Sequence, residues 1–319
     1  MRNMFVLLCA ALFTVGVIAT PAKAAWPDRP IRIIVPFNPG AGTDQQGRLV
    51  EKEFKETFGQ PLNFVYKPGA DGAIGATELA NSRPDGYTIG LYAFPLMVMG
   101  PLLGKGKYGP ESFDYLGISC KDVAVLVVPK DSPIKSFEDF VTQAKANPGK
   151  LRVGVVEILG PTHITALRLQ QQGVPMNIVP HAGGSKAMVA VLGGHIDALL
   201  AVTGASLNSA SKLNFLAVAS DEPEALLPGV PTFKEKGFDI VSAFARVWLA
   251  PKGLPADVKQ RLGEGLKSIY AREDVKERHD KAGLPVRFED GTVLNQWIDA
   301  FMPEARGLVD LYNQQKAQQ

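Results

Sequence analysis

The sequence predicts an α/β protein of two lobes with a ligand cleft between them. Short apolar runs alternate with helical patterns over the first hundred residues, and a second series of the same kind begins after residue 130. Two strand-like runs, separated by a short polar break, connect the first series to the second. A long extended run near residue 242 then returns the chain from the second series to the first. Alternating strands and helices favour parallel βαβ units. Two crossings between such lobes would leave a cleft that can close around a ligand.

The first lobe begins with an apolar run at 31–35, which is typical of a strand buried on both faces. A glycine-rich turn follows Phe37, and Thr43 with Gln46 fits a capping box that opens a helix continuing to 58. Further strands are expected at 62–66 and 87–92, with a glycine turn at 67–75 and a helix to 81 between them. Because ligands bind beyond the carboxyl ends of parallel strands, the turn after Phe37 should border the cleft.

The second lobe is expected to start where strands at 115–119 and 123–129 are separated only by residues 120–122. Helices are then expected at 136–146, 161–172 and 185–192, and strands at 151–156, 177–179, 197–202 and 215–219. After the extended run at 240–251, helices are expected at 256–270, 273–282 and 290–314. The predicted division is 25–121 with 243–319 for the first, discontinuous lobe, and 122–242 for the second.

The first 24 residues have the pattern of a secretory signal peptide. Arg2 precedes an apolar core, and Ala22-Lys23-Ala24 satisfies the small-x-small cleavage rule, so cleavage is expected after Ala24 and the protein is expected in the periplasm. Removal of 1–24 takes two of the 34 basic residues and none of the 32 acidic ones, which leaves equal numbers of each. This balance gives no support to nucleic-acid binding. Cys120 would be the only remaining cysteine, which excludes an internal disulfide.

The sequence lacks the common templates for catalysis and for metal binding. There is no Gly-x-Ser-x-Gly elbow, and the Ser-x-x-Lys matches at 132–135 and 209–212 have no partner motifs. The four histidines lack close-spaced ligand pairs, so no metal site is expected. His163 beside Thr162 is the one weak candidate for a catalytic base.

A nucleotide site is also disfavoured. Gly40 and Gly42 follow a strand and open a helix, but Gln45 stands where a dinucleotide fingerprint needs its third glycine. A formal match at 104–109 is followed by Pro110 and is not preceded directly by a strand, and there is no Walker pattern. No cofactor is therefore expected.

Three glycine turns at the starts of helices are the positive signals. They are the turn after Phe37, the segment 160–163, and the segment 180–185. Free backbone N–H groups gather at such places and favour a carboxylate or phosphate. Pro161 suits a first helical turn, and Thr162 and His163 could aim donors outward.

The order of several motifs resembles the solute-binding proteins of tripartite tricarboxylate transporters, the Bug family of bacterial periplasmic receptors. The resemblance covers nearly all of the chain after residue 24. The matching segments are 26–31, 35–44, 67–75, 84–88, 148–151, 160–163, 192–197 and 227–232.

The resemblance implies a periplasmic-binding-protein-like fold of type II and capture of a small carboxylated solute by two loops, partly through water. The solute would be a di- or tricarboxylate, an amino acid or an aromatic acid, and it would be delivered to membrane transporter subunits. Carried over by position, the ligand-binding residues would be Phe37, Gly40, Ala41, Gly42, Thr43 and Ala93 in the first lobe, and Gly160, Thr162 and His163 in the second.

Three residues depart from the family pattern. Ala41 stands where a second glycine is usual, His181 where a tyrosine is common, and Glu157 in a loop usually filled by small polar residues. An acid at Glu157 would repel a plain dicarboxylate unless it pairs with Arg246 or meets a ligand amine. The hypothesis is therefore an amino acid or hydroxy-carboxylate ligand.

Other residues are expected to act less directly. Asp44 should organise the first loop from the first turn of its helix, and Phe37, Phe94, His181 and Phe244 should set the size of the pocket. The expected function is a non-catalytic receptor for transport. A ligand-sensing receptor that acts on a signalling partner, or an enzyme of the same architecture, are the alternatives.

Overall fold

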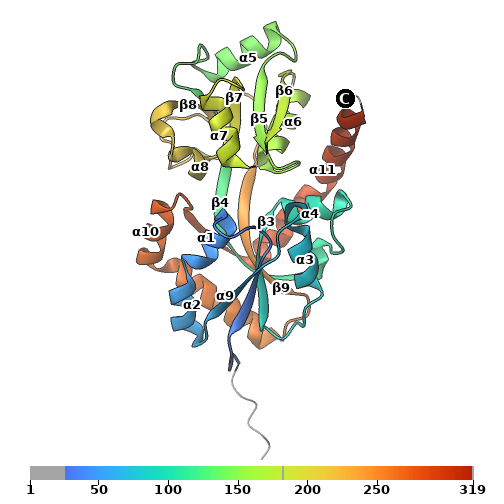
Figure 1. Ribbon diagram of the computed structural model, residues 1–319, viewed down its shortest axis with the longest axis vertical. Helices are drawn as coiled ribbons and strands as arrows, with labels where there is room; N and C mark the ends of the chain where they lie inside the picture. The colour runs from blue at the N-terminus through green and yellow to red at the C-terminus, as the bar shows by residue number, and fades with distance from the viewer. Residues whose placement is uncertain (1–25, 182, 318–319) are drawn as a thin grey trace, which may run out of the picture.

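The computed structural model describes residues 26–181 and 183–317 (Figure 1). The predicted signal peptide, with its cleavage site after Ala24, lies outside these residues, as does Ala182. No helix within the described ranges has both the length and the apolar character that crossing a bilayer requires.

Ten strands of the described residues form one sheet with the central order β2-β1-β3-β9-β4-β7-β5-β6, and β10 and β8 pair with β4. β1 pairs in parallel with β2 and β3, and β5 pairs in parallel with β6 and β7, which confirms the βαβ units. The strands are β1 (Ile31–Val35), β2 (Leu62–Tyr66), β3 (Thr88–Phe94), β4 (Phe113–Pro129), β5 (Arg152–Val156), β6 (Asn177–His181), β7 (Ala198–Val202), β8 (Leu213–Val218), β9 (Ala243–Pro251) and β10 (Val286–Asp290).

The two lobes are joined by β4 and β9, which pair with each other in antiparallel fashion (Figure 1). β4 pairs with β9 from Phe113 to Val123, and with β7 and β8 from Ala124 onward. The two-lobe α/β fold with two crossing segments is therefore confirmed. The exact lobe boundaries at 121/122 and 242/243 stay a prediction.

Helices cover both faces of the sheet in each lobe. In the lower lobe of Figure 1 these are α1 (Gly42–Arg48), α2 (Glu51–Phe58), α3 (Ala73–Ala80), α4 (Leu96–Leu102), α9 (Ala256–Ala271) and α10 (Glu273–Lys281), and α11 (Gly291–Ala317) rises from this lobe to end beside the upper lobe. In the upper lobe they are α5 (Phe137–Ala146), α6 (Pro161–Gln171), α7 (Gly184–Leu192) and α8 (Thr203–Leu207). Short 3₁₀ turns occur at Ala70–Gly72, Pro110–Ser112 and Ala210–Lys212.

Three expectations about these elements were wrong. The helix expected over 43–58 is two helices, because the fully buried Val50 has a non-helical backbone between them. The two strands expected at 115–129 are one strand, since residues 120–122 continue the pairing with β9 after a register shift. The elements α4, α8 and β10 were not expected at all.

The lobes also touch beside the crossing strands. The loop after α10 meets the start of α8 so closely that a Cβ on Gly204 would lie 1.9 Å from the carbonyl oxygen of Gly283. The N–H of Gly204 donates to Asp122 of β4 at 2.9 Å. Two ion pairs, Arg168–Glu304 and Arg287–Glu224, join elements of the upper lobe to elements of the lower lobe.

Replacement of Gly204 by alanine should lower the free energy of unfolding by about 1–3 kcal/mol, because the added methyl group meets backbone that cannot rotate away. Urea unfolding followed by circular dichroism measures this effect. Gly307→Ala is the matched control, since Gly307 is exposed in α11 with nothing within 4 Å of an added Cβ, and it should stabilise slightly. An unchanged midpoint for Gly204→Ala would contradict the contact between the lobes.

Candidate functional site

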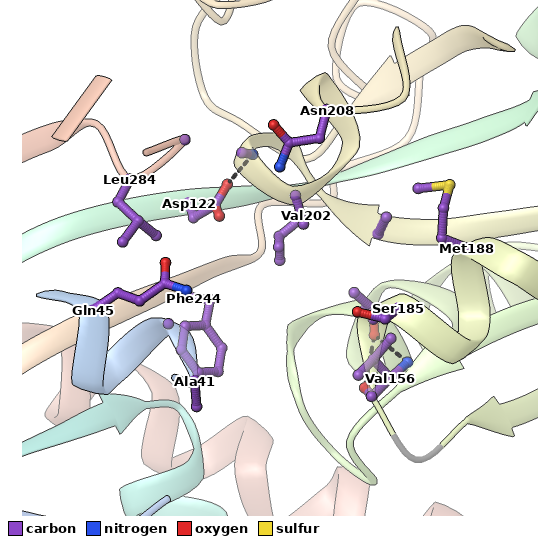
Figure 2. A pocket seen from close by; sticks show the side chains of 18 of the residues that line it. Ala41, Gln45, Asp122, Val156, Ser185, Met188, Val202, Asn208, Phe244 and Leu284 are labelled. Atoms are coloured by element: carbon purple, nitrogen blue, oxygen red, sulfur yellow. Dashed lines mark hydrogen bonds between the residues drawn. The ribbon is translucent and has the colours of Figure 1, made fainter. Parts of the chain in front are cut away.

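A cavity of about 740 Å³ lies between the lobes (Figure 2). Figure 2 shows Ala41, Gln45 and Phe244 on one side, and Val156 and Ser185 on the other. The lining residues are Gly40, Ala41, Gly42, Gln45, Asp122, Val156, Glu157, Thr162, Gly183, Gly184, Ser185, Met188, Leu199, Ala201, Val202, Gly204, Ala205, Asn208, Ser209, Phe244, Arg246, Ala282, Gly283 and Leu284. The cavity lies beyond the carboxyl ends of β1 and β5, where α/β sheets bind ligands.

The cavity brings together part of the predicted site. Gly40, Ala41, Gly42, Glu157, Thr162, Phe244 and Arg246 line it, whereas Phe37, Thr43, Asp44, Ala93, Gly160, His163 and His181 are not among its lining residues. Their binding of a ligand stays a prediction. Ala93 packs behind the lining, since it is fully buried in β3 and pairs with Arg246 in the sheet.

The first loop is held by Asp44, as expected. The N–H of Gly40 donates to Asp44 Oδ2 at 2.7 Å, and the hydroxyl of Tyr66 donates to Asp44 Oδ1 at 2.8 Å. The predicted capping box is wrong, because Ala41 is the N-cap residue and Gln46 instead reaches the hydroxyl of Tyr270. The buried carboxylate therefore orders the turn that presents residues 40–42 to the cavity.

In the second loop, which follows β5 and leads into α6, two polar side chains form hydrogen bonds to the backbone of the loop itself. The Thr162 hydroxyl accepts from the N–H of Val156 and donates to the carbonyl of the same residue, both at 2.8 Å. His163 Nδ1 accepts from the N–H of Leu159 at 3.0 Å, and burial lowers the pKa of His163 to about 4. The expectation that Thr162 aims its hydroxyl donor outward was wrong, and for His163, which uses Nδ1 as an acceptor within the loop, an outward donor stays a prediction. These hydrogen bonds shape the loop, and Val156, Glu157 and Thr162 are its residues that line the cavity.

Three of the four aromatic and imidazole side chains expected to set the pocket size do not line the cavity. Phe94 contacts Phe301 of α11 edge-on, with ring centroids 5.3 Å apart. His181 is half-buried in β6, beside Gly154, and its Nε2 has no hydrogen-bond partner among the described residues. Phe37 lies against Tyr92, with ring centroids 6.1 Å apart. Phe244 is the member of this set that lines the cavity.

Several lining residues were missed as site residues. Asp122 lies in the break that was interpreted only as a crossing, and Ser185 belongs to the third glycine turn, whose position gave a usable signal. Asn208 and the loop at 282–284 carried no signal, because nothing local indicates that they face the opposite lobe.

The charged groups of the cavity are Glu157, Asp122 and Arg246. Burial, assisted by the charge of Asp71 and opposed by that of Arg246, raises the pKa of Glu157 to about 7. Burial likewise raises the pKa of Asp122 to about 6, against the hydrogen bond from Gly204 and the charge of Arg246. Pairing of Glu157 with Arg246, one of the two ways in which its charge could be balanced, is not found within the described residues. The cavity thus combines one cation with two acids that resist ionisation.

Comparison with known proteins gives the family. The model of the family described as "Tripartite tricarboxylate transporter family receptor" matches residues 47–310. The chain belongs to this receptor family. It is 30% identical over 317 residues to the "UPF0065 protein in gbd 5′region" of Cupriavidus necator, covering 98% of this chain and 97% of the relative. It is 29% identical to the protein BugT of Bordetella pertussis, over 84% of this chain and 86% of that protein.

A solved structure agrees with the family. The crystal structure of a TctC solute-binding protein from Polaromonas, without ligand, is 30% identical and has a TM-score of 0.78, with 89% of the receptor and 99% of that chain covered. The resemblance inferred from the motifs is therefore confirmed.

Replacement of Asp44 by alanine should lower the free energy of unfolding by about 1–3 kcal/mol, because Gly40 N–H and the Tyr66 hydroxyl both lose their acceptor. Tyr66→Phe is the matched control, since it removes one of these two hydrogen bonds and leaves the loop bond in place. It should cost about 0.5–1.5 kcal/mol. Equal stability of the two variants in urea unfolding would contradict a role for Asp44 in holding the loop.

The Glu157→Gln variant should gain stability relative to the wild-type receptor as pH rises. The pKa of Glu157 is raised from 4.5 to about 7 on folding, so the stabilisation from the bound proton is complete below pH 4.5 and is lost by about pH 7. The difference in unfolding free energy should therefore grow across this window. Asp71→Asn should move the upper end of the window to lower pH, because the charge of Asp71 helps to raise the pKa of Glu157. A difference in unfolding free energy between Glu157→Gln and the wild-type receptor that does not change with pH would contradict the raised pKa.

Proposed function

We propose that this receptor captures a small organic carboxylate in the periplasm and delivers it to the membrane subunits of a tripartite tricarboxylate-type transporter. The observation that carries the proposal is the cavity between the lobes, which loops of both lobes line together with one buried cation. Membership of the receptor family supports it. Capture and release need no titrating nucleophile, and Nδ1 of His163, the one weak candidate for a catalytic base, already accepts a hydrogen bond within its own loop.

The ligand class follows from Glu157. Its backbone lies in the left-handed region at φ +48°, a conformation that is unfavourable for a glutamate, and the residue lines the cavity. A carboxyl group there accepts from an ammonium or hydroxyl group, and it disfavours a second carboxylate. We therefore propose an amino acid or hydroxy acid as the ligand.

Calorimetric titration with succinate, malate and aspartate tests both parts of the proposal. These four-carbon diacids differ only in carrying no donor, a hydroxyl group or an ammonium group at one carbon. We expect malate or aspartate to bind more tightly than succinate, and Glu157→Gln to remove the difference. Tighter binding of succinate, or an unchanged preference in the variant, would contradict the assigned ligand class.

Native mass spectrometry of the receptor as purified from the periplasm extends the test to ligands outside this series. A co-purified organic acid is the expected result. A deletion strain should then lose uptake of that acid, and unchanged uptake would favour the sensing alternative over transport. Failure to bind any acid in both measurements would contradict the proposed function.

A further inference from the structure

Arg246 is a buried cation that lines the cavity. It lies on β9, where the strand passes between the lobes, and it pairs across the sheet with Ala93 of β3 and Cys120 of β4. Only 7% of its surface is exposed. A guanidinium group remains charged in proteins, and its charge is delocalised over a planar group that is more weakly hydrated than an ammonium.

The contacts of Arg246 do not neutralise its charge. Nη1 donates to Cys120 Sγ at 3.3 Å, and burial raises the pKa of that thiol to about 11, so the sulfur is uncharged. The guanidinium carbon lies 5.3 Å from the centroid of the Phe244 ring. Nε is buried and has no hydrogen-bond partner among the described residues. These contacts orient the guanidinium group and leave donor capacity unused.

The first loop, at residues 40–42, leaves space for the guanidinium group of Arg246. A Cβ on Gly42 would lie 2.6 Å from Nη2 of Arg246, so the absence of a side chain at Gly42 allows the guanidinium group to lie against the loop. Glu157 and Asp122 line the same cavity, and Arg246 lowers the pKa of each, but neither forms an ion pair with it in the described part of the chain. An unpaired buried charge is strongly unfavourable, and this one lies where a ligand enters.

We propose that Arg246 is the charge partner of the ligand carboxylate and that it determines the selectivity of the receptor for ionised acids over their neutral amides. This inference rests on the proposed function, to which it adds the residue that recognises the acid. Backbone N–H groups of the loops donate to an amide oxygen as well as to a carboxylate oxygen. A guanidinium group discriminates between them, because it forms paired, charge-assisted hydrogen bonds only with the carboxylate. Glu157, from the opposite lobe, would then face the donor on the ligand.

The test is calorimetric titration of Arg246→Met with the four-carbon diacid that binds the wild-type receptor most tightly. We expect the affinity to fall about 10- to 100-fold, the loss typical of charge-assisted hydrogen bonds. The unliganded variant should unfold at the same or a higher temperature, because a buried, unpaired charge has been replaced by an apolar side chain of similar length. Arg246→Lys keeps the charge but loses the paired geometry of the guanidinium group. Its affinity for the diacid should therefore lie between that of the wild-type receptor and that of Arg246→Met.

The control is Arg29→Met. Arg29 also lies over an aromatic ring, with its guanidinium carbon 3.9 Å from the Tyr87 centroid, but it is exposed and outside the cavity lining. Its removal should leave the affinity unchanged.

Each other outcome is decisive. Affinity of Arg246→Met within twofold of wild type would overturn the inference and leave the proposed function standing. Loss of stability in the unliganded Arg246→Met protein, restored by Arg246→Lys, would assign Arg246 a structural role and also overturn it. If the wild-type receptor itself binds no acid, the proposed function fails, and the inference fails with it.

Discussion

The antiparallel pairing of β4 with β9 is the constraint on which the rest of the structure depends. β4 pairs with strands of both lobes, and β9 pairs with it as far as Val123, where the chain crosses between the lobes, so the cleft is formed around two hydrogen-bonded backbones. The pairing also brings Asp122, Arg246 and Phe244 to the cavity from two segments more than a hundred residues apart in the sequence. The remaining walls are the loops that follow β1 and β5, the start of α7, parts of β7 and α8, and the loop after α10.

The two main loops are built by one physical strategy. In each, a buried polar side chain bonds to the backbone of its own turn: Asp44 holds Gly40, and Thr162 holds Val156. Such bonds satisfy side chains that would otherwise be costly to bury. They also order the loop backbone before a ligand arrives, which reduces the entropy lost on binding. The charged groups of the cavity then lie on an ordered framework.

Much of the fold could be predicted because local patterns carry it. Apolar runs identified β1, β5 and β7, and Pro161 after Gly160 marked the start of α6. The misses have particular causes. The continuity of β4 through Lys121 and Asp122 depends on pairing with β9, and a polar pair in isolation is typical of a turn. The roles of Thr162 and His163 depend on which neighbouring N–H groups lie within reach, and spacing alone does not determine this.

The sequence by itself determined the α/β class, the family and the two glycine loops that line the cavity, because periodicity, glycine positions and motif order are properties of neighbouring residues. Only the tertiary structure decided the chemistry between the lobes. The unpaired state of Arg246, the raised pKa of Glu157 and the presence of Asp122 beside them depend on burial and on distances across the cavity. Charges separated along the chain acquire these properties only when the fold removes them from water and places them together.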